Sequence, residues 1–138
     1  MIVDANIATY WMVNSPFRSA AAYAARTDLL APAIIRVETV SALLKYLRAG
    51  FITRDRVNES IDVLEEAIGE FVDDASLIRG AAGLAAQHGH PVYDCLYLAL
   101  ALQRQEPLAT ADRRMATLAQ TLGITVELIL PDQQDPAP

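Results

Sequence analysis

The chain of 138 residues is long enough to bury the core of one domain, and with 53% hydrophobic and 20% charged residues it is expected to be globular. Its net charge of −6 argues against a broad electrostatic grip on nucleic acid, although it does not exclude a local one. No apolar run reaches the length of a signal segment or a membrane span, and the single Cys95 cannot form an internal disulfide, so we expect a cytoplasmic protein that does not enter a membrane.

Short apolar strands alternate with helices along the whole chain. In chain order, the first half is predicted as a strand at residues 1–4, helices at 5–13 and 17–26, a strand at 28–31, and helices at 33–49 and 54–68. The second half is predicted as a strand at 69–72, helices at 74–88 and 92–102, a strand at 107–110, a helix at 112–122 and a strand at 124–130. Residues 1–130 form the expected domain, and the polar, proline-rich residues 131–138 are expected to be a frayed tail.

Residues with special backbone preferences mark several of these boundaries. Ser15 with Pro16 suits the start of a helix, and Thr53 suits the cap of another. Pro32 is expected to stop the second strand, and Gly50 is expected to end the long helix that follows.

This order of elements predicts an α/β fold with three layers, α/β/α, around a short, mostly parallel five-stranded sheet. In such sheets the reactive crevice lies outside the carboxyl ends of the strands, where the strand order reverses. Asp4 ends the first strand and Asp112 follows the fourth. The two aspartates should therefore face each other if those strands are neighbours.

The helix at residues 92–102 carries a single charged residue, Asp94, in an otherwise apolar or aromatic run. Pro91 suits its first position, because proline has no N–H to leave unpaired there. A helix that is apolar on every side is expected to be buried. An ionised carboxylate in such a helix is costly unless it is paired, neutralised or bound to a cation.

The helix at residues 33–49 shows two stripes. Its apolar stripe, which helical spacing assigns to the core, comprises Val37, Val40, Leu44 and Leu47. The opposing stripe comprises Glu38, Ser41, Lys45 and Arg48.

Four carboxylates stand out by their placement, namely Asp4, Glu38, Asp94 and Asp112. Taken singly, Asp4 and Asp112 suit the N-caps of the helices after their strands, and Glu38 suits a solvent-facing position on an amphipathic helix. Taken together, they are the oxygen ligands that Mg²⁺ and Mn²⁺ prefer, and in one crevice they would hold one or two such ions.

Four short motifs carry these acids, namely I-V-D-A-N at residues 2–6, R-V-E-T-V-S-A-L-L at 36–44, V-Y-D-C-L-Y-L-A-L-A at 92–101 and L-A-T-A-D-R-R-M at 108–115. In this order and spacing they resemble the PIN-domain family of metal-dependent ribonucleases, and within it the VapC-type toxins of toxin–antitoxin pairs. The resemblance covers about residues 1–130.

The resemblance implies a metal-dependent endoribonuclease that cleaves RNA and is paired with a cognate antitoxin protein. The implied catalytic and metal-binding acids are Asp4, Glu38, Asp94 and Asp112, with Mg²⁺ or Mn²⁺ as the cofactor. Asn6, Ser41 and Thr110 fall where the family has polar residues that support these acids. Ser41 lies one helical turn from Glu38, within reach of a hydrogen bond. The helices rich in Ala, Leu and Val also predict a homodimer.

Further residues near the motifs have two interpretations each. Arg113 and Arg114 flank the acids and would reach substrate phosphates, or they are solvated residues of a first helical turn. His88 and His90 bracket Gly89, which indicates a helix-end turn more strongly than a metal site.

Two other functions fit acids at strand ends. A receiver-type phosphoacceptor signalling module needs a lysine near the end of the last strand, whereas the only lysine, Lys45, lies in the helix at residues 33–49. A catalytically inactive PIN-like binding module is the second alternative, and the presence of all four acids argues against it.

Overall fold

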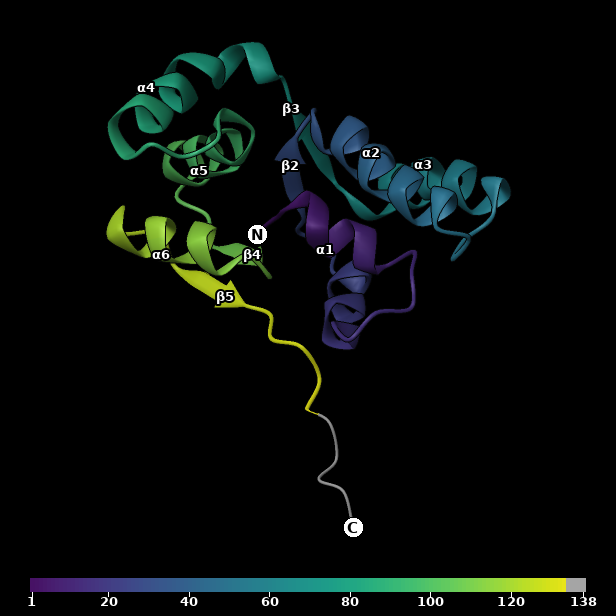
Figure 1. Cartoon of the computed structure of the whole chain (residues 1–138). Helices are drawn as coiled ribbons and strands as arrows, with labels where there is room; N and C mark the ends of the chain where they lie inside the picture. The colour runs from purple at the N-terminus through teal and green to yellow at the C-terminus, as the bar shows by residue number, and fades with distance from the viewer. Residues whose placement is uncertain (134–138) are drawn as a thin grey trace.

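Five short strands form one parallel sheet in the middle of the molecule (Figure 1). The computed structural model describes residues 1–133, and the rest of the predicted tail, residues 134–138, lies outside this described part. The strands are β1 (Ile2–Val3), β2 (Leu30–Pro32), β3 (Glu70–Val72), β4 (Leu108–Thr110) and β5 (Val126–Leu128). They are arranged in the order β3-β2-β1-β4-β5, and every pairing is parallel.

Helices cover both faces of the sheet, which confirms the predicted three-layer α/β/α fold. The helices before β3 are α1 (Ala5–Tyr10), η1 (Arg18–Ala25), α2 (Ile35–Arg48) and α3 (Arg54–Ala67). Those after β3 are η2 (Asp74–Ser76), α4 (Ile78–His88), α5 (Val92–Arg104) and α6 (Arg113–Thr121). Crossovers between parallel strands are right-handed, so the reversal of strand order in the sheet puts α1, α2 and α3 on one face and α4, α5 and α6 on the other (Figure 1).

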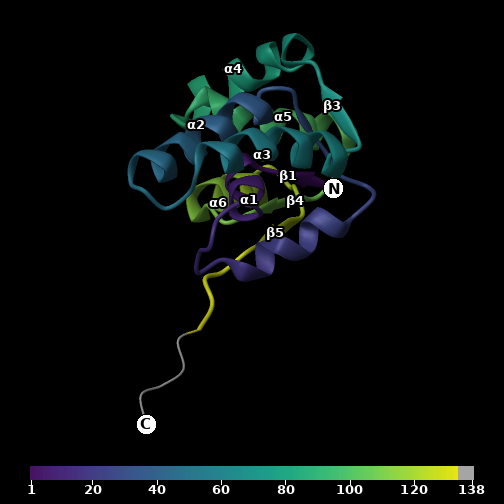
Figure 2. The ribbon, with the colours of Figure 1, turned by 90° about the vertical axis from the view of Figure 1, so that its right-hand side faces the viewer.

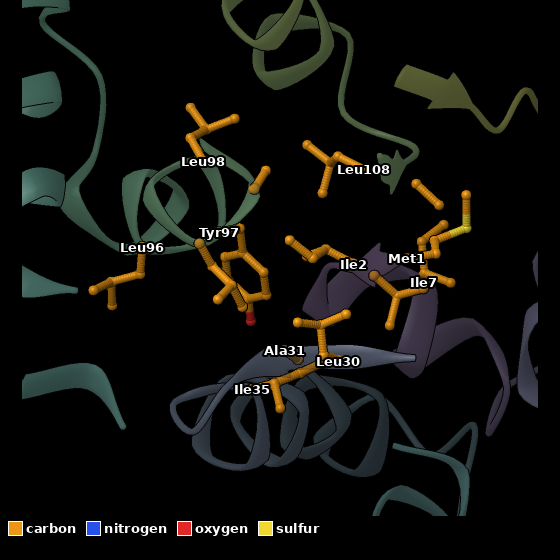
Figure 3. Close-up of a cluster of buried hydrophobic side chains, with 14 of the residues drawn as sticks. Met1, Ile2, Ile7, Leu30, Ala31, Ile35, Leu96, Tyr97, Leu98 and Leu108 are labelled. Carbon is orange, nitrogen blue, oxygen red and sulfur yellow. The ribbon is translucent and has the colours of Figure 1, made fainter. Parts of the chain in front are cut away.

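The main core lies between α5 and the sheet, as Figure 3 shows for Ile2, Leu98 and Leu108. The side chains that α5 buries are Cys95, Leu96, Tyr97, Leu98, Leu100 and Ala101. The prediction that α5 is buried on every side is wrong near its two ends, where Tyr93 is 57% exposed and Leu102 is 42% exposed. None of the helices within residues 1–133 is long and apolar enough to cross a membrane.

The buried face of α2 differs from the stripe that the sequence predicts. Ile35, Thr39 and Leu43 are the buried residues of α2, whereas Val37 is 69% exposed. The rest of the predicted stripe packs only in part, against a second small cluster of Met12, Leu43 and Val57. The difference arises because α2 contacts α1 on one side and α3 on the other, so its neighbours and not its own periodicity select the buried side chains.

The structure corrects two local predictions and adds detail to two others. The segment predicted as an α-helix at residues 17–26 is the 3₁₀ helix η1, which lies beside β5 (Figure 2). Its first turn has no side-chain cap, since the Ser15 hydroxyl accepts from the N–H of Phe17 instead. Pro32 is the last residue of β2, because proline is tolerated where a strand ends. The tail is held at its start, where the N–H of Asp132 donates to the carbonyl of Pro16 at 2.6 Å.

Candidate active site

Two of the four acids follow neighbouring strands at the carboxyl edge of the sheet. β1 pairs with β4 through Val3 and Ala109, so Asp4 and Asp112 leave the sheet side by side. The hydroxyl of Thr110 joins them, because it donates to Oδ2 of Asp4 and accepts from the N–H of Asp112 at 3.0 Å. The strand order reverses between β1 and β4, which is where open α/β sheets bind their ligands.

Both aspartates also cap helices, as their ordinary interpretation predicts. Oδ1 of Asp4 accepts from the N–H of Ile7 at 3.0 Å, at the start of α1. Oδ1 of Asp112 accepts from the N–H groups of Arg114 and Met115 at 2.9 and 3.1 Å, at the start of α6. Each cap uses only Oδ1, so the caps orient both carboxylates and leave other lone pairs for a ligand.

Glu38 of α2 is held by a side chain of α5. The Tyr97 hydroxyl donates to Oε1 of Glu38 at 2.9 Å, and Tyr97 is only 1% exposed. In Figure 3 the hydroxyl of Tyr97 points out of the apolar cluster toward α2. Ser41, the predicted partner of Glu38, is exposed and makes no hydrogen bond to it within residues 1–133. That prediction was wrong because Glu38 turns toward α5 instead of along its own helix.

Asp94 has a partner one turn earlier in the chain. Nε2 of His90 lies 3.0 Å from Oδ2 of Asp94, and the His90 side chain is 6% exposed. The side chain of Asp94 is 30% exposed, so solvent and ligands reach it. His90 therefore does more than belong to the turn between α4 and α5, which was the interpretation that its sequence favours.

Burial raises the pKa values of Asp4, Glu38 and Asp94, and neighbouring carboxylates add to the rise. Burial is the main cause of the raised pKa of Asp4, which reaches about 6, and the charges of Asp94 and Asp112 add to it. Burial likewise raises the pKa of Glu38 and of Asp94, with further contributions from Asp94 on Glu38 and from Asp112 on Asp94. Hydrogen bonds from Thr110, Tyr97 and His90 act in the opposite direction. Asp94 therefore lies within electrostatic range of Asp4 and Glu38, and Asp112 lies within range of Asp4 and Asp94.

The donor set fits a divalent cation that keeps part of its water shell. Within the described residues, no three side chains of His, Cys, Asp or Glu lie close enough together to form a closed ligand cluster. Mg²⁺ does not require one, since it typically takes one or two carboxylates and completes its octahedron with water and substrate phosphate. Carboxylate oxygens are also its preferred ligands and those of Mn²⁺.

A comparison with models of protein families identifies the family of the chain. The model of the PIN domain matches residues 1–120. The chain belongs to the PIN-domain family. PIN domains are generally nucleases, and this membership argues against the receiver-type alternative. None of the curated protein sequences matches the chain.

Two solved structures share the fold of this PIN domain. One is the crystal structure of VapBC2 from Rickettsia felis bound to a DNA fragment from the VapBC2 promoter. It matches at a TM-score of 0.58 and 15% identity, over 93% of this chain and 97% of the matched chain. FitAcB from Neisseria gonorrhoeae matches at a TM-score of 0.54 and 20% identity, over 91% of this chain and 94% of the other. At these identities the likeness shows the fold alone.

Two further residues that the sequence assigns to the site, Asn6 and Arg113, lie exposed at the surface. Asn6 is exposed and makes no hydrogen bond to the acids in the part of the chain that the structure describes. Arg113 is exposed on α6, but it is the charge of Arg114 that lowers the pKa of Asp94. The sequence reasoning missed Tyr97 as a partner of Glu38. A residue three positions after Asp94 lies on the same helix face, so spacing places Tyr97 beside Asp94 but does not identify Glu38 as its partner.

Proposed function

We propose that this PIN domain is a metal-dependent endoribonuclease and acts as the VapC-type toxin of a toxin–antitoxin pair. The observation that carries the proposal is that Asp4 and Asp112 share the hydroxyl of Thr110 at the carboxyl edge of the sheet, while the charge of Asp94 acts on both Asp4 and Glu38. Asp4 and Asp112 come from the ends of β1 and β4, Glu38 from α2 and Asp94 from α5. Their charges act on one another, which is costly unless a cation is bound among them.

In this proposal Asp4, Glu38, Asp94 and Asp112 hold Mg²⁺ or Mn²⁺. The ion supplies polarisation of the scissile phosphoryl group, activation of water and stabilisation of the leaving oxygen. The protein contributes fixed ligand positions: the Thr110 hydroxyl orients Asp4, and the Tyr97 hydroxyl orients Glu38. Hydrogen bonds of this kind to a metal-binding carboxylate fix the orientation of its oxygens and exclude alternative rotamers.

Cleavage of a labelled RNA pool tests the proposal directly. Parent protein is incubated with the RNA in Mg²⁺, in Mn²⁺ and in EDTA, beside the Asp112→Asn variant. We expect internal cuts in RNA that require the metal and Asp112. An intact RNA pool in both metals would overturn the nuclease proposal and favour the catalytically inactive binding module.

A cognate antitoxin is the proposed partner. The chain has the fold of proteins solved as VapBC2 and FitAcB, the first of them on promoter DNA. A cluster of carboxylates also suits an inhibitor that presents an arginine, which pairs with carboxylates through two parallel hydrogen bonds. Purification from the native host should recover the protein with a bound polypeptide that suppresses RNA cleavage. Recovery of only free, fully active protein would contradict this.

We also propose a homodimer. Large apolar side chains remain exposed on the described surface, among them Val37 at 69% and Phe51 at 76%. Twofold pairing is the commonest way in which soluble proteins cover such surfaces. Light scattering at micromolar concentration should give twice the mass of the 15.0 kDa chain. A measured mass equal to that of one chain would contradict the proposed homodimer.

A further inference from the structure

A hollow of about 420 Å³ lies between the end of α4, the start of α5 and the outer face of α6. Figure 1 shows these three elements on the same face of the sheet. We call it the cationic hollow and define it by its lining residues, which are His88, His90, Arg113, Arg114, Thr117, Leu118 and Thr121. Its volume falls in the range of ordinary ligand clefts, about 300–1,000 Å³.

The charge of the cationic hollow is opposite to that of the whole chain. Among the described residues, no aspartate or glutamate lines it, whereas the protein carries a net charge of −6. Arg113 and Arg114 form no ion pair within residues 1–133. The arginines that do pair with a carboxylate there are Arg18, Arg26, Arg36, Arg56 and Arg104. Two guanidinium groups in the cationic hollow thus keep their donors for a ligand.

The cationic hollow adjoins the carboxylates through shared residues. His90 lines the hollow and at the same time contacts Oδ2 of Asp94 at 3.0 Å. Arg113 and Arg114 directly follow Asp112, and the charge of Arg114 lowers the pKa of Asp94. The cationic hollow therefore borders Asp94 and Asp112, beside any phosphate that these carboxylates would hold.

The chemistry of the lining selects an anion with oxygen acceptors. Arginine forks match the oxygens of a phosphodiester, and the threonine hydroxyls are already used, since Thr117 and Thr121 donate to carbonyls of α6. The recognition would be independent of base sequence, as phosphate contacts are.

We propose that the cationic hollow binds the phosphodiester next to the scissile one in a single-stranded RNA substrate. This inference rests on the proposed ribonuclease function and assigns the path of the strand beyond the carboxylates. The acids hold the scissile group, and Arg113 and Arg114 hold the neighbouring phosphate. The cationic hollow thereby attracts RNA locally to a protein whose overall charge repels it.

The test compares the double variant Arg113→Gln/Arg114→Gln with the control Arg54→Gln. Arg54 is also exposed and without an ion pair in the described chain, but it begins α3 on the other face of the sheet. Single-turnover cleavage of a short, labelled RNA pool in Mn²⁺ is measured against protein concentration at several salt concentrations. Binding of the same RNA is measured by fluorescence anisotropy in EDTA, and thermal melting reports folding.

The double variant should need roughly tenfold more protein for half-maximal cleavage, while the rate at saturation changes little. The slope of log K against log salt should become shallower by roughly 0.7 for each phosphate that the variant no longer binds. The control should match the parent in both, and all three proteins should melt together. If the double variant needs no more protein for half-maximal cleavage than the control does, and has the same salt slope, the proposed role of the cationic hollow is overturned.

Failure of the proposed function gives a different result. If the parent cuts no RNA in Mn²⁺, the ribonuclease proposal fails. The anisotropy measurement of RNA binding then still tests the cationic hollow. A shallower salt slope that is found only in the double variant supports phosphate binding there, and equal slopes in all three proteins contradict it.

Discussion

The Tyr97 hydroxyl and Oε1 of Glu38 lie 2.9 Å apart and connect α5 to α2 across 59 residues of sequence. Tyr97 belongs to the main core, and Glu38 belongs to the acidic edge. The hydrogen bond therefore ties the packing of the core to the position of a carboxylate in the site, and it opposes the rise in the pKa of Glu38 that burial causes.

Tyr97→Phe should destabilise the protein by roughly 1–2 kcal/mol, because the partly buried carboxylate of Glu38 loses its donor. Its Mn²⁺ affinity should also fall, since Glu38 is no longer held in one rotamer. The measurements are urea unfolding in EDTA and Mn²⁺ titration. Tyr93→Phe is the matched control on the same helix, because Tyr93 is 57% exposed. Equal unfolding of the two variants would show that the hydrogen bond contributes nothing.

Asp94→Asn should abolish RNA cleavage without lowering stability in metal-free buffer. The amide keeps the shape and an acceptor for His90, and it removes a charge that burial and Asp112 both disfavour. Thermal melts in EDTA and in Mn²⁺ check this. The melting temperature in EDTA should be unchanged or raised, and Mn²⁺ should stabilise the parent much more than the variant. A variant that melts lower in EDTA and gains as much from Mn²⁺ as the parent would contradict the role of Asp94 as a ligand.

The pKa of Asp4 predicts how stability depends on pH. Burial raises this pKa from 3.8 to about 6, so the folded protein holds the proton more tightly than the unfolded chain does. Stability should therefore fall as pH rises from about 4 to about 6, by up to roughly 3 kcal/mol, and level off above that range. Urea unfolding at several pH values in EDTA measures it. Asp4→Asn, which can still cap α1, should lose this part of the pH dependence, and an identical profile would exclude Asp4 as its source.

Asp112 caps α6 and is also a proposed metal ligand, and substitutions can separate these two roles. Asp112→Asn keeps an acceptor for the N–H groups of Arg114 and Met115, so its stability should stay close to that of the parent. Asp112→Ala removes the cap of α6 and should cost about 1 kcal/mol. Both variants should lose RNA cleavage, since both remove the carboxylate. Cleavage that survives in Asp112→Asn and fails only in Asp112→Ala would mean that Asp112 acts through the helix cap alone.

The sequence by itself determined the sheet and the aspartates at its edge. Apolar runs and capping residues act locally, so they marked five strands and predicted that Asp4 and Asp112 would meet if β1 and β4 paired. The carboxyl ends of parallel strands share one edge, and the pairing of β1 with β4 therefore brings those two residues together. The motifs around Glu38 and Asp94 likewise predicted the family that the PIN-domain match confirmed.

Only the tertiary structure decided what supports the acids. Whether the carboxylate of Glu38 lies near Ser41 or near Tyr97 depends on how α2 and α5 pack against the sheet. No local pattern in the sequence determines how far Glu38 lies from Tyr97, which is 59 residues away along the chain. The same holds for α2, where Val37 is exposed and Thr39 is buried because α1 and α3 flank this helix. Spacing along a chain fixes which residues share a face of an element, but the burial of a face depends on neighbours far away in sequence.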